Sequence, residues 1–284
     1  MINLRTVPKS FAVCSRLMSS SQVKPLVGVS VDDERITTLQ LQRAPVNSFS
    51  LELLQELHDS VLEVEKNKCK GLVLTSESPK VFSAGMDLNE FHKPDRQRLT
   101  LVKETLFDAI TKIFGTDLIS TVAINGYTAA GACFVALSCD YRVMTSGPAA
   151  IGVNDTAVGI PPAMWIYDLM SRVIGPKHTE YALTSSTMYS AERALQVGLV
   201  DQIAADKTDA VEKCKAFIRT YDQISPAIRA TTKRAIRQEY LTNVEKNRKK
   251  YVTDYLKLVE SPEFQKNIDQ YIQNLKHKKA AKVK

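Results

Sequence analysis

The sequence TVAINGYTAAGACFVALSCDYRVMTSGPAAIGVNDTAVGI occupies residues 121–160 and decides how the chain folds. Apolar, mostly β-branched side chains at 122–124 lead to Asn125-Gly126, a pattern typical of a buried strand that meets a tight turn. Only Ala and Gly follow at 129–132, so no side chain shields the N–H groups of a helix start. Because the first turn of a helix leaves its N–H groups unpaired, this segment is suited to binding developing negative charge.

A further strand, expected at 140–144, leads to a loop with one carboxylate. Asp155 ends the run Ile151-Gly152-Val153-Asn154-Asp155, where its neighbours are mostly apolar or small. An acid in such surroundings is costly unless it has a role. Asp155 is therefore the first candidate for a catalytic group.

Composition indicates a soluble globular protein with a sizeable core. The chain has 284 residues, of which 44% are hydrophobic and 24% charged. No run approaches the roughly 18 apolar residues of a membrane-spanning helix. The number of cysteines is odd and none forms a C-x-x-C pair, which indicates free thiols in a reducing compartment (Cys14, Cys69, Cys133, Cys139, Cys214).

Both ends of the chain are basic. Residues 1–24 contain four Lys or Arg, no acid and a three-serine run, which is typical of a mitochondrial transit peptide, with a disordered tail as the alternative. We expect location in the mitochondrial matrix. Five lysines lie within 276–284, and a solvated tail explains them better than a nucleic-acid arm.

Strands and helices alternate along the first two thirds of the chain, which predicts an α/β architecture with parallel strand pairs. A hairpin at 27–41 opens a core that we place at 25–205. A helical region at 206–284 follows, with helices at 207–221, 226–258 with an interruption, and 262–278. An apolar stripe on the last helix could cover its own core or a neighbouring subunit (Phe264, Ile268, Tyr271, Ile272, Leu275).

Several common site motifs are absent from the sequence. It has no G-x-S-x-G, Walker A or G-x-G-x-x-G pattern, and its four histidines show no metal-ligand spacing, so we expect no metal. His92 could touch a ligand, although a lone surface histidine is the simpler interpretation. Four aromatic residues could line an acyl pocket, but such spacing is more often core (Phe91, Phe107, Phe114, Trp165).

Two turns with exposed backbone are more informative as a pair. Ala84-Gly85 and Gly131 each follow a strand-like run and carry little side chain. If the N–H groups of Ala84 and Gly131 point at one place, they form an oxyanion hole, which stabilises the enolate of a thioester. Together with one buried acid they indicate proton abstraction beside a carbonyl.

At these residues the sequence resembles the crotonase (enoyl-CoA hydratase/isomerase) superfamily, and within it the mitochondrial Δ3,Δ2-enoyl-CoA isomerases. The likeness runs from about residue 27 to residue 203. Its strongest segments are PVNS at 45–48, VFSAGMDL at 81–88, AING at 123–126, CDYR at 139–142 and IGVNDT at 151–156.

The resemblance implies a spiral of ββα units, a C-terminal helical region used for homotrimer assembly, and an acyl-CoA substrate. Coenzyme A is part of this substrate, and no separate cofactor is expected. The resemblance places CoA near the segment Ala84, Gly85, Met86, Asp87 and Leu88. It implies that the N–H groups of Ala84 and Gly131 bind the thioester oxygen. It also implies that Asn154 contacts the substrate and that Asp155 is the catalytic acid.

The chain departs from the family pattern at two positions. Asp155 replaces a glutamate, so its carboxylate is one methylene shorter, and a misplacement of about 1 Å can cost roughly 100-fold in rate. Phe134 stands where hydratases carry a second glutamate, and a phenylalanine cannot activate water. We therefore expect an isomerase that moves the double bond of a 3-enoyl-CoA into conjugation during β-oxidation. The alternative is a relative that binds acyl-CoA without turnover, or RNA through its lysine tail.

Overall fold

A six-stranded sheet forms the centre of the fold, and its inner strands β3 and β5 are buried on both faces. The computed structural model describes residues 24–281. The strands lie in the order β1-β2-β3-β5-β7-β10, with β1 antiparallel to β2 and the remaining pairs parallel. Their bounds are β1 Val27–Val31, β2 Ile36–Leu41, β3 Gly71–Ser76, β5 Ile119–Ile124, β7 Tyr141–Thr145 and β10 Gln202–Ala204. The expected hairpin and parallel pairs are confirmed.

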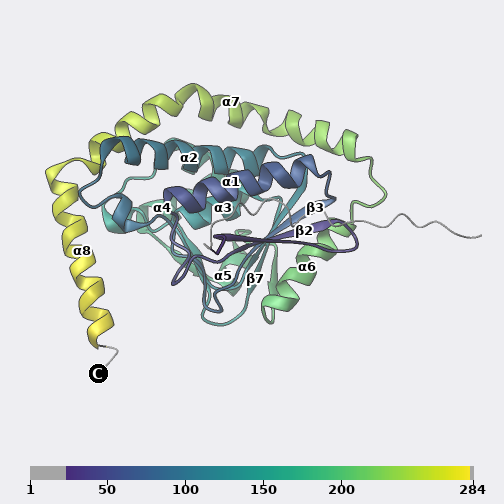
Figure 1. Cartoon of the computed structure of the whole chain (residues 1–284), viewed down its shortest axis with the longest axis horizontal. Helices are drawn as coiled ribbons and strands as arrows, with labels where there is room; N and C mark the ends of the chain where they lie inside the picture. The colour runs from purple at the N-terminus through teal and green to yellow at the C-terminus, as the bar shows by residue number, and fades with distance from the viewer. Residues whose placement is uncertain (1–23, 282–284) are drawn as a thin grey trace, which may run out of the picture.

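The two faces of this sheet pack against different helices (Figure 1). On β3, Leu72 and Leu74 join the main core, which includes α1 (Leu51–Lys66), α2 (Arg96–Gly115) and α3 (Gly131–Ser138). Val73 points the other way, into a smaller cluster with α6 (Lys207–Arg219). This is the two-residue period of a strand.

A second sheet holds the turns that carry the candidate site. Its four strands contain three residues each and lie in the order β4-β6-β8-β9, with bounds Val81–Ser83, Tyr127–Ala129, Ala150–Gly152 and Met188–Ser190. Along the chain, β4, β6 and β8 each follow a strand of the large sheet and precede a helix. This repeat is the expected spiral of ββα units. The sequence analysis did not predict β6, β8 or β9, because three residues are too few to show a period.

Shorter helices and one kinked helix connect the sheets to the C-terminal region. They are η1 (Leu88–Glu90), η2 (Thr156–Val158), α4 (Met164–Ser185) and α5 (Ala191–Gln196). Gly175 has a positive φ of 74° and kinks α4 just before Pro176. Ser190 caps α5 by accepting a hydrogen bond from the Arg193 N–H.

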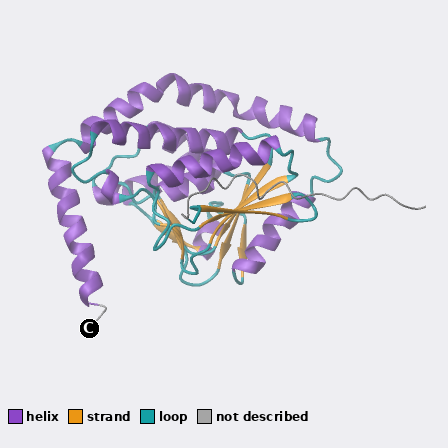
Figure 2. Cartoon of the chain, in the orientation of Figure 1, coloured by secondary structure: helices purple, strands orange, loops and turns teal. Residues whose placement is uncertain are grey.

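The C-terminal region consists of α6, α7 (Pro226–Val259) and α8 (Pro262–Ala281). The predicted interruption of the middle helix is wrong, since α7 is continuous and arches over α2 (Figure 2). Lys233 and Arg237 anchor α7 to the core through Asp140, at 2.7 and 2.6 Å. Helix α8 packs against η2 and α7 of its own chain, where Phe264 and Ile268 are buried.

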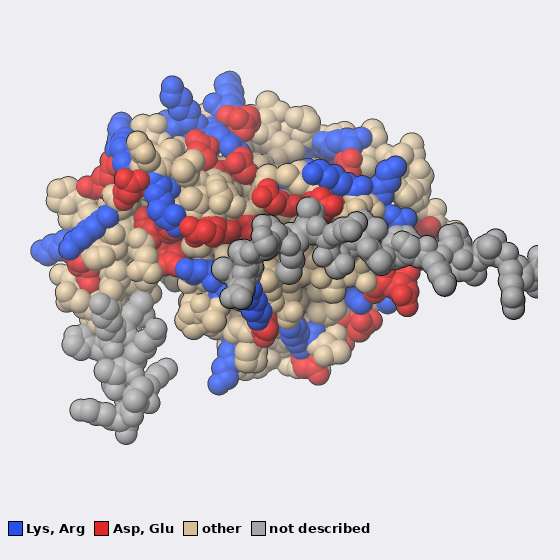
Figure 3. Space-filling view, in the orientation of Figure 1, with Lys and Arg blue, Asp and Glu red and all other residues tan. Residues whose placement is uncertain are grey.

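The surface mixes both signs of charge, as Figure 3 shows for one face. Within residues 24–281 no helix is long and apolar enough to cross a membrane. The expected transit peptide lies almost entirely outside the described residues, and so do the side chains of the lysine tail.

Candidate active site

A cavity of about 660 Å³ opens between the two turns and the helices α2, α4, α7 and α8. This volume lies in the usual range for a small-molecule site. Six of the predicted site residues line it: Ala84, Met86, Leu88, Gly131, Asn154 and Asp155. Segments that are far apart in the sequence therefore meet at one cavity, as the chemistry requires.

Gly85 and Asp87 are not on the cavity wall. The Asp87 carboxylate forms an ion pair with Arg43 at 2.8 Å and caps η1 by accepting from the Asn89 N–H. Gly85 has a φ of 84°, and a Cβ there would lie 2.6 Å from the Ala129 carbonyl oxygen. Both residues thus hold the turn in place, and neither lines the expected site.

The expectation that the Ala84 N–H holds the substrate oxygen is wrong in this structure. That N–H donates to the Val46 carbonyl oxygen at 3.0 Å. A donor with an intramolecular partner is not available to a ligand. Ala84 contributes only surface to the cavity.

Met86, two residues further along the same turn, presents its N–H differently from Ala84. Met86 pairs with Phe49 in an isolated parallel bridge. In this bridge the Phe49 N–H donates to the Gly85 carbonyl, and the Asp87 N–H donates to the Phe49 carbonyl. Backbone groups alternate along an extended segment, so the Met86 N–H faces the other side. It has no acceptor among the described residues. A Cβ on Gly131 would lie 3.4 Å from the Met86 sulfur, so the two residues are adjacent.

Gly131 is the first residue of α3, and its N–H also has no acceptor among residues 24–281. Ala130 precedes it with a φ of 50° and no side-chain cap. A non-glycine residue rarely adopts this conformation, and such strain is often found at functional turns. The Ala130 N–H donates to Gly152 at 3.0 Å, which fixes the turn on β8.

Asp155 is held rigidly at the start of η2, and its carboxylate has no hydrogen-bond or ion-pair partner among the described residues. Its carbonyl oxygen accepts from the N–H groups of Val158 and Ile160, at 3.0 and 2.9 Å. The neighbouring Thr156 hydroxyl donates to the Leu183 carbonyl of α4. The residue is 8% exposed. Burial raises the pKa of the Asp155 carboxyl to about 6, which Lys103 partly opposes.

Lys103 also lines the cavity and was missed in the sequence analysis. It is 7% exposed, and burial lowers the pKa of its ammonium to about 8. Position 103 lies between Leu99 and Leu106 on the buried stripe of α2. That spacing was the signal that the sequence offered.

Aromatic residues divide between the cavity and the core. Phe91, Phe134 and Trp165 line the cavity, whereas Phe107 and Phe114 lie in the main core. Phe134 contacts Trp165 edge-to-face, with ring centroids 5.2 Å apart. The cavity is therefore largely apolar around the buried side chains of Lys103 and Asp155.

His92 is paired and does not line the cavity. Its Nε2 lies 2.5 Å from an Asp269 carboxylate oxygen, a contact that ties α8 to the loop after η1. Among residues 24–281, no group of three His, Cys, Asp or Glu side chains could hold a metal ion.

This fold, with one buried acid in a cavity between two turns, has counterparts among known proteins. Residues 32–280 match the enoyl-CoA hydratase/isomerase family, to which the chain belongs. Mouse enoyl-CoA delta isomerase 1, mitochondrial, is 33% identical over 86% of this chain and 85% of its own. The human protein of the same name is 32% identical, over 86% and 81%.

Solved structures give the same result. The crystal structure of human mitochondrial delta3-delta2-enoyl-CoA isomerase has a TM-score of 0.86 and 31% identity, covering 89% of this chain and 99% of that one. Enoyl-CoA hydratase from Bacillus halodurans has a TM-score of 0.79 at 21% identity, covering 86% and 99%, and shows the fold alone. These similarities support an enzyme that processes enoyl-CoA thioesters.

Proposed function

We propose that the protein is a Δ3,Δ2-enoyl-CoA isomerase in which one carboxylate moves the proton. The observation that carries this proposal is the Asp155 carboxylate, buried on the wall of the cavity without a partner among the described residues. A pKa of about 6 leaves it mostly ionised at pH 7 and closer in basicity to a weak carbon acid than an exposed aspartate is.

The proposed reaction has two proton transfers. Asp155 removes a proton from C2 of the 3-enoyl thioester, and the C–H electron pair passes into a dienolate with its charge on the thioester oxygen. The N–H groups of Met86 and Gly131 donate to that oxygen; one such donor is typically worth about 100- to 1,000-fold in rate. Asp155 then returns the proton to C4, which leaves the conjugated 2-enoyl-CoA.

Phe134 favours isomerisation over hydration. Hydration needs one group to activate water and another to protonate carbon. Phe134 is 3% exposed and packs against Trp165, so its ring presents no acid or base to the cavity. Isomerisation needs only the one carboxylate.

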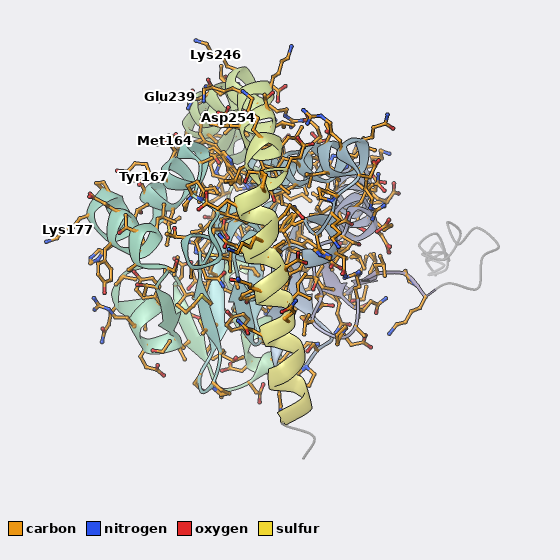
Figure 4. All side chains as sticks on the ribbon, turned by 90° about the vertical axis from the view of Figure 1, so that its left-hand side faces the viewer. Met164, Tyr167, Lys177, Glu239, Lys246 and Asp254 are labelled. Atoms are coloured by element: carbon orange, nitrogen blue, oxygen red, sulfur yellow. The ribbon has the colours of Figure 1, made fainter. Side chains whose placement is uncertain are left out.

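The same proposal includes the cell compartment, the substrate and the assembly. The mitochondrial relatives and the acid-free basic N-terminus support the mitochondrial matrix and a role in β-oxidation. CoA is part of the substrate, and no further cofactor is needed for proton transfer. A homotrimer is supported by exposed apolar side chains on α4 and α7 (Met164, Tyr181, Ile228 and Ile236). In Figure 4, labelled residues of these two helices lie along one flank of the molecule.

The test is conversion of 3-enoyl-CoA to 2-enoyl-CoA by wild type and two variants. Asp155→Asn keeps the size but cannot accept a proton, so we expect a loss of about 100- to 10,000-fold. Asp155→Glu restores the reach of a glutamate and raises the rate if the cavity has kept glutamate-sized geometry. Asp254→Asn is the matched control, because Asp254 lines the same cavity but pairs with Lys250.

Equal rates for wild type and Asp155→Asn would remove Asp155 from the mechanism. No turnover by any variant or by wild type, with 3-enoyl-CoA still bound, would instead favour an acyl-CoA-binding protein without activity.

A further inference from the structure

Lys103 is a second buried charged group in the cavity, and the proton transfers proposed above do not use it. Its ammonium has no hydrogen-bond acceptor or ion-pair partner among the described residues, and it lines the cavity. Burying an ammonium without a partner is strongly unfavourable. A lysine kept there on an otherwise apolar helix face needs an explanation.

Aromatic rings hold the Lys103 ammonium in place. Its Nζ lies 4.1 Å from the ring centroid of Tyr255, and 5.4 and 5.6 Å from those of Phe107 and Trp165. These distances are in the range of cation–π contacts, which attract an ammonium to the face of a ring. The rings therefore fix the position of the charge, although they do not neutralise it.

The group that can balance this charge is Asp155, which lines the same cavity and is equally buried. The two side chains form no direct ion pair, and both line the wall of the cavity. Other titratable groups around the cavity are Cys133 of α3, Tyr251, Tyr255 and the Lys250–Asp254 pair of α7, Tyr271 of α8 and Tyr127 of β6. Burial raises the pKa values of Cys133 and Tyr255, so both stay neutral near pH 7.

We propose that Lys103 is a positioning residue for Asp155: the two form a charge pair across the cavity, and the ammonium keeps the carboxylate ionised until substrate arrives. The catalytic part of this inference rests on the proposed function, whereas the charge pair itself does not. An opposite charge nearby favours the ionised form of an acid, and a separation beyond direct contact weakens but does not abolish the effect in an apolar cavity.

The experiment measures the pair directly. Carbon-13 NMR of protein labelled at aspartate carboxyl groups, with Asp155→Asn used for assignment, follows the titration of Asp155 in wild type and in Lys103→Met. We expect the midpoint to rise by about one pH unit in Lys103→Met, the lower end of the effect of an opposite charge. Lys112→Met is the matched control, because Lys112 lies on the same helix but pairs with Glu65 outside the cavity.

A reciprocal measurement keeps the test decisive if Lys103→Met does not fold. Coupling between two sites is mutual, so removing Asp155 must lower the titration midpoint of Lys103 by the same amount. Asp155→Asn provides this arm, with Lys103 followed through NMR of labelled lysines. Unchanged midpoints in either arm, in folded protein, overturn the charge pair.

Activity gives the last readout. If both proposals hold, the acid limb of kcat/KM moves up with the Asp155 midpoint, so Lys103→Met loses about five-fold at pH 6 and little at pH 8. A shifted NMR midpoint with an unmoved activity limb supports the pair and contradicts Asp155 as the base. Unmoved midpoints with normal activity overturn the role of Lys103 alone.

Discussion

Lowering the pH from 7 to 5 should switch off the proposed base while the protein stays folded. The pKa of Asp155 is raised from 3.8 to about 6, mainly because burial disfavours the carboxylate. Proton abstraction needs the ionised form, so activity is present above this pKa and is lost as the pH falls through it. At a pKa of about 6 the ionised fraction is about 0.9 at pH 7 and about 0.1 at pH 5.

We therefore expect kcat/KM to fall about ten-fold between pH 7 and pH 5. An exposed aspartate with an ordinary pKa would stay roughly 90% ionised at pH 5. Such a group would give an almost flat dependence of kcat/KM on pH between about 5 and 7. The assay follows the absorbance of the conjugated thioester in initial-rate measurements, with circular dichroism at each pH to check folding. A flat profile in folded protein would refute the argument that burial sets the basicity of Asp155.

Three further predictions test the turn, the reaction and the assembly. Gly85→Ala should lower the free energy of unfolding by on the order of 2 kcal/mol and reduce activity. The reason is that the new Cβ would collide with the Ala129 carbonyl oxygen and that position 85 has a positive φ. An unchanged denaturant unfolding curve would contradict this. Wild type incubated with 2-enoyl-CoA should form no 3-hydroxyacyl-CoA by chromatography, because Phe134 replaces the second acid; hydration at the isomerase rate would show otherwise. Light scattering on the protein without residues 1–24 should give about three chain masses, and a clean monomer would disprove the trimer.

The large sheet and the order of its helices could be predicted because their segments are long enough to show a period. Strand β3 is six residues long, and every residue in it is buried. The small sheet could not be predicted, because each of its strands has only three residues and its pairing depends on segments far apart in the chain. Helix α7 was predicted with a break, yet it is continuous from Pro226 to Val259, although few of its side chains are buried.

At the candidate site, the sequence predicted segments that do meet at one cavity, but it could not show which backbone N–H groups already have partners. It pointed to the turn at Ala84, but the acceptor of the Ala84 N–H is Val46, a contact that only tertiary structure supplies. Met86 was named for its place beside CoA, and its N–H faces the cavity because Phe49 pairs with the other side of the segment. From the sequence, Lys103 cannot be distinguished from an ordinary surface lysine of a helix. Its position beside the Tyr255 ring of α7 is visible only in the tertiary structure.

The central claim is that one buried carboxylate carries a proton from C2 to C4. The most direct measurement uses 3-enoyl-CoA in which both hydrogens on C2 are deuterium. After a single turnover, the position of the deuterium in the 2-enoyl-CoA product is determined. Because Asp155 is buried and therefore exchanges protons with solvent slowly, the account predicts that deuterium removed from C2 appears at C4 in a substantial fraction of the product. Full turnover with hydrogen at C4 derived entirely from solvent would contradict a single-carboxylate shuttle.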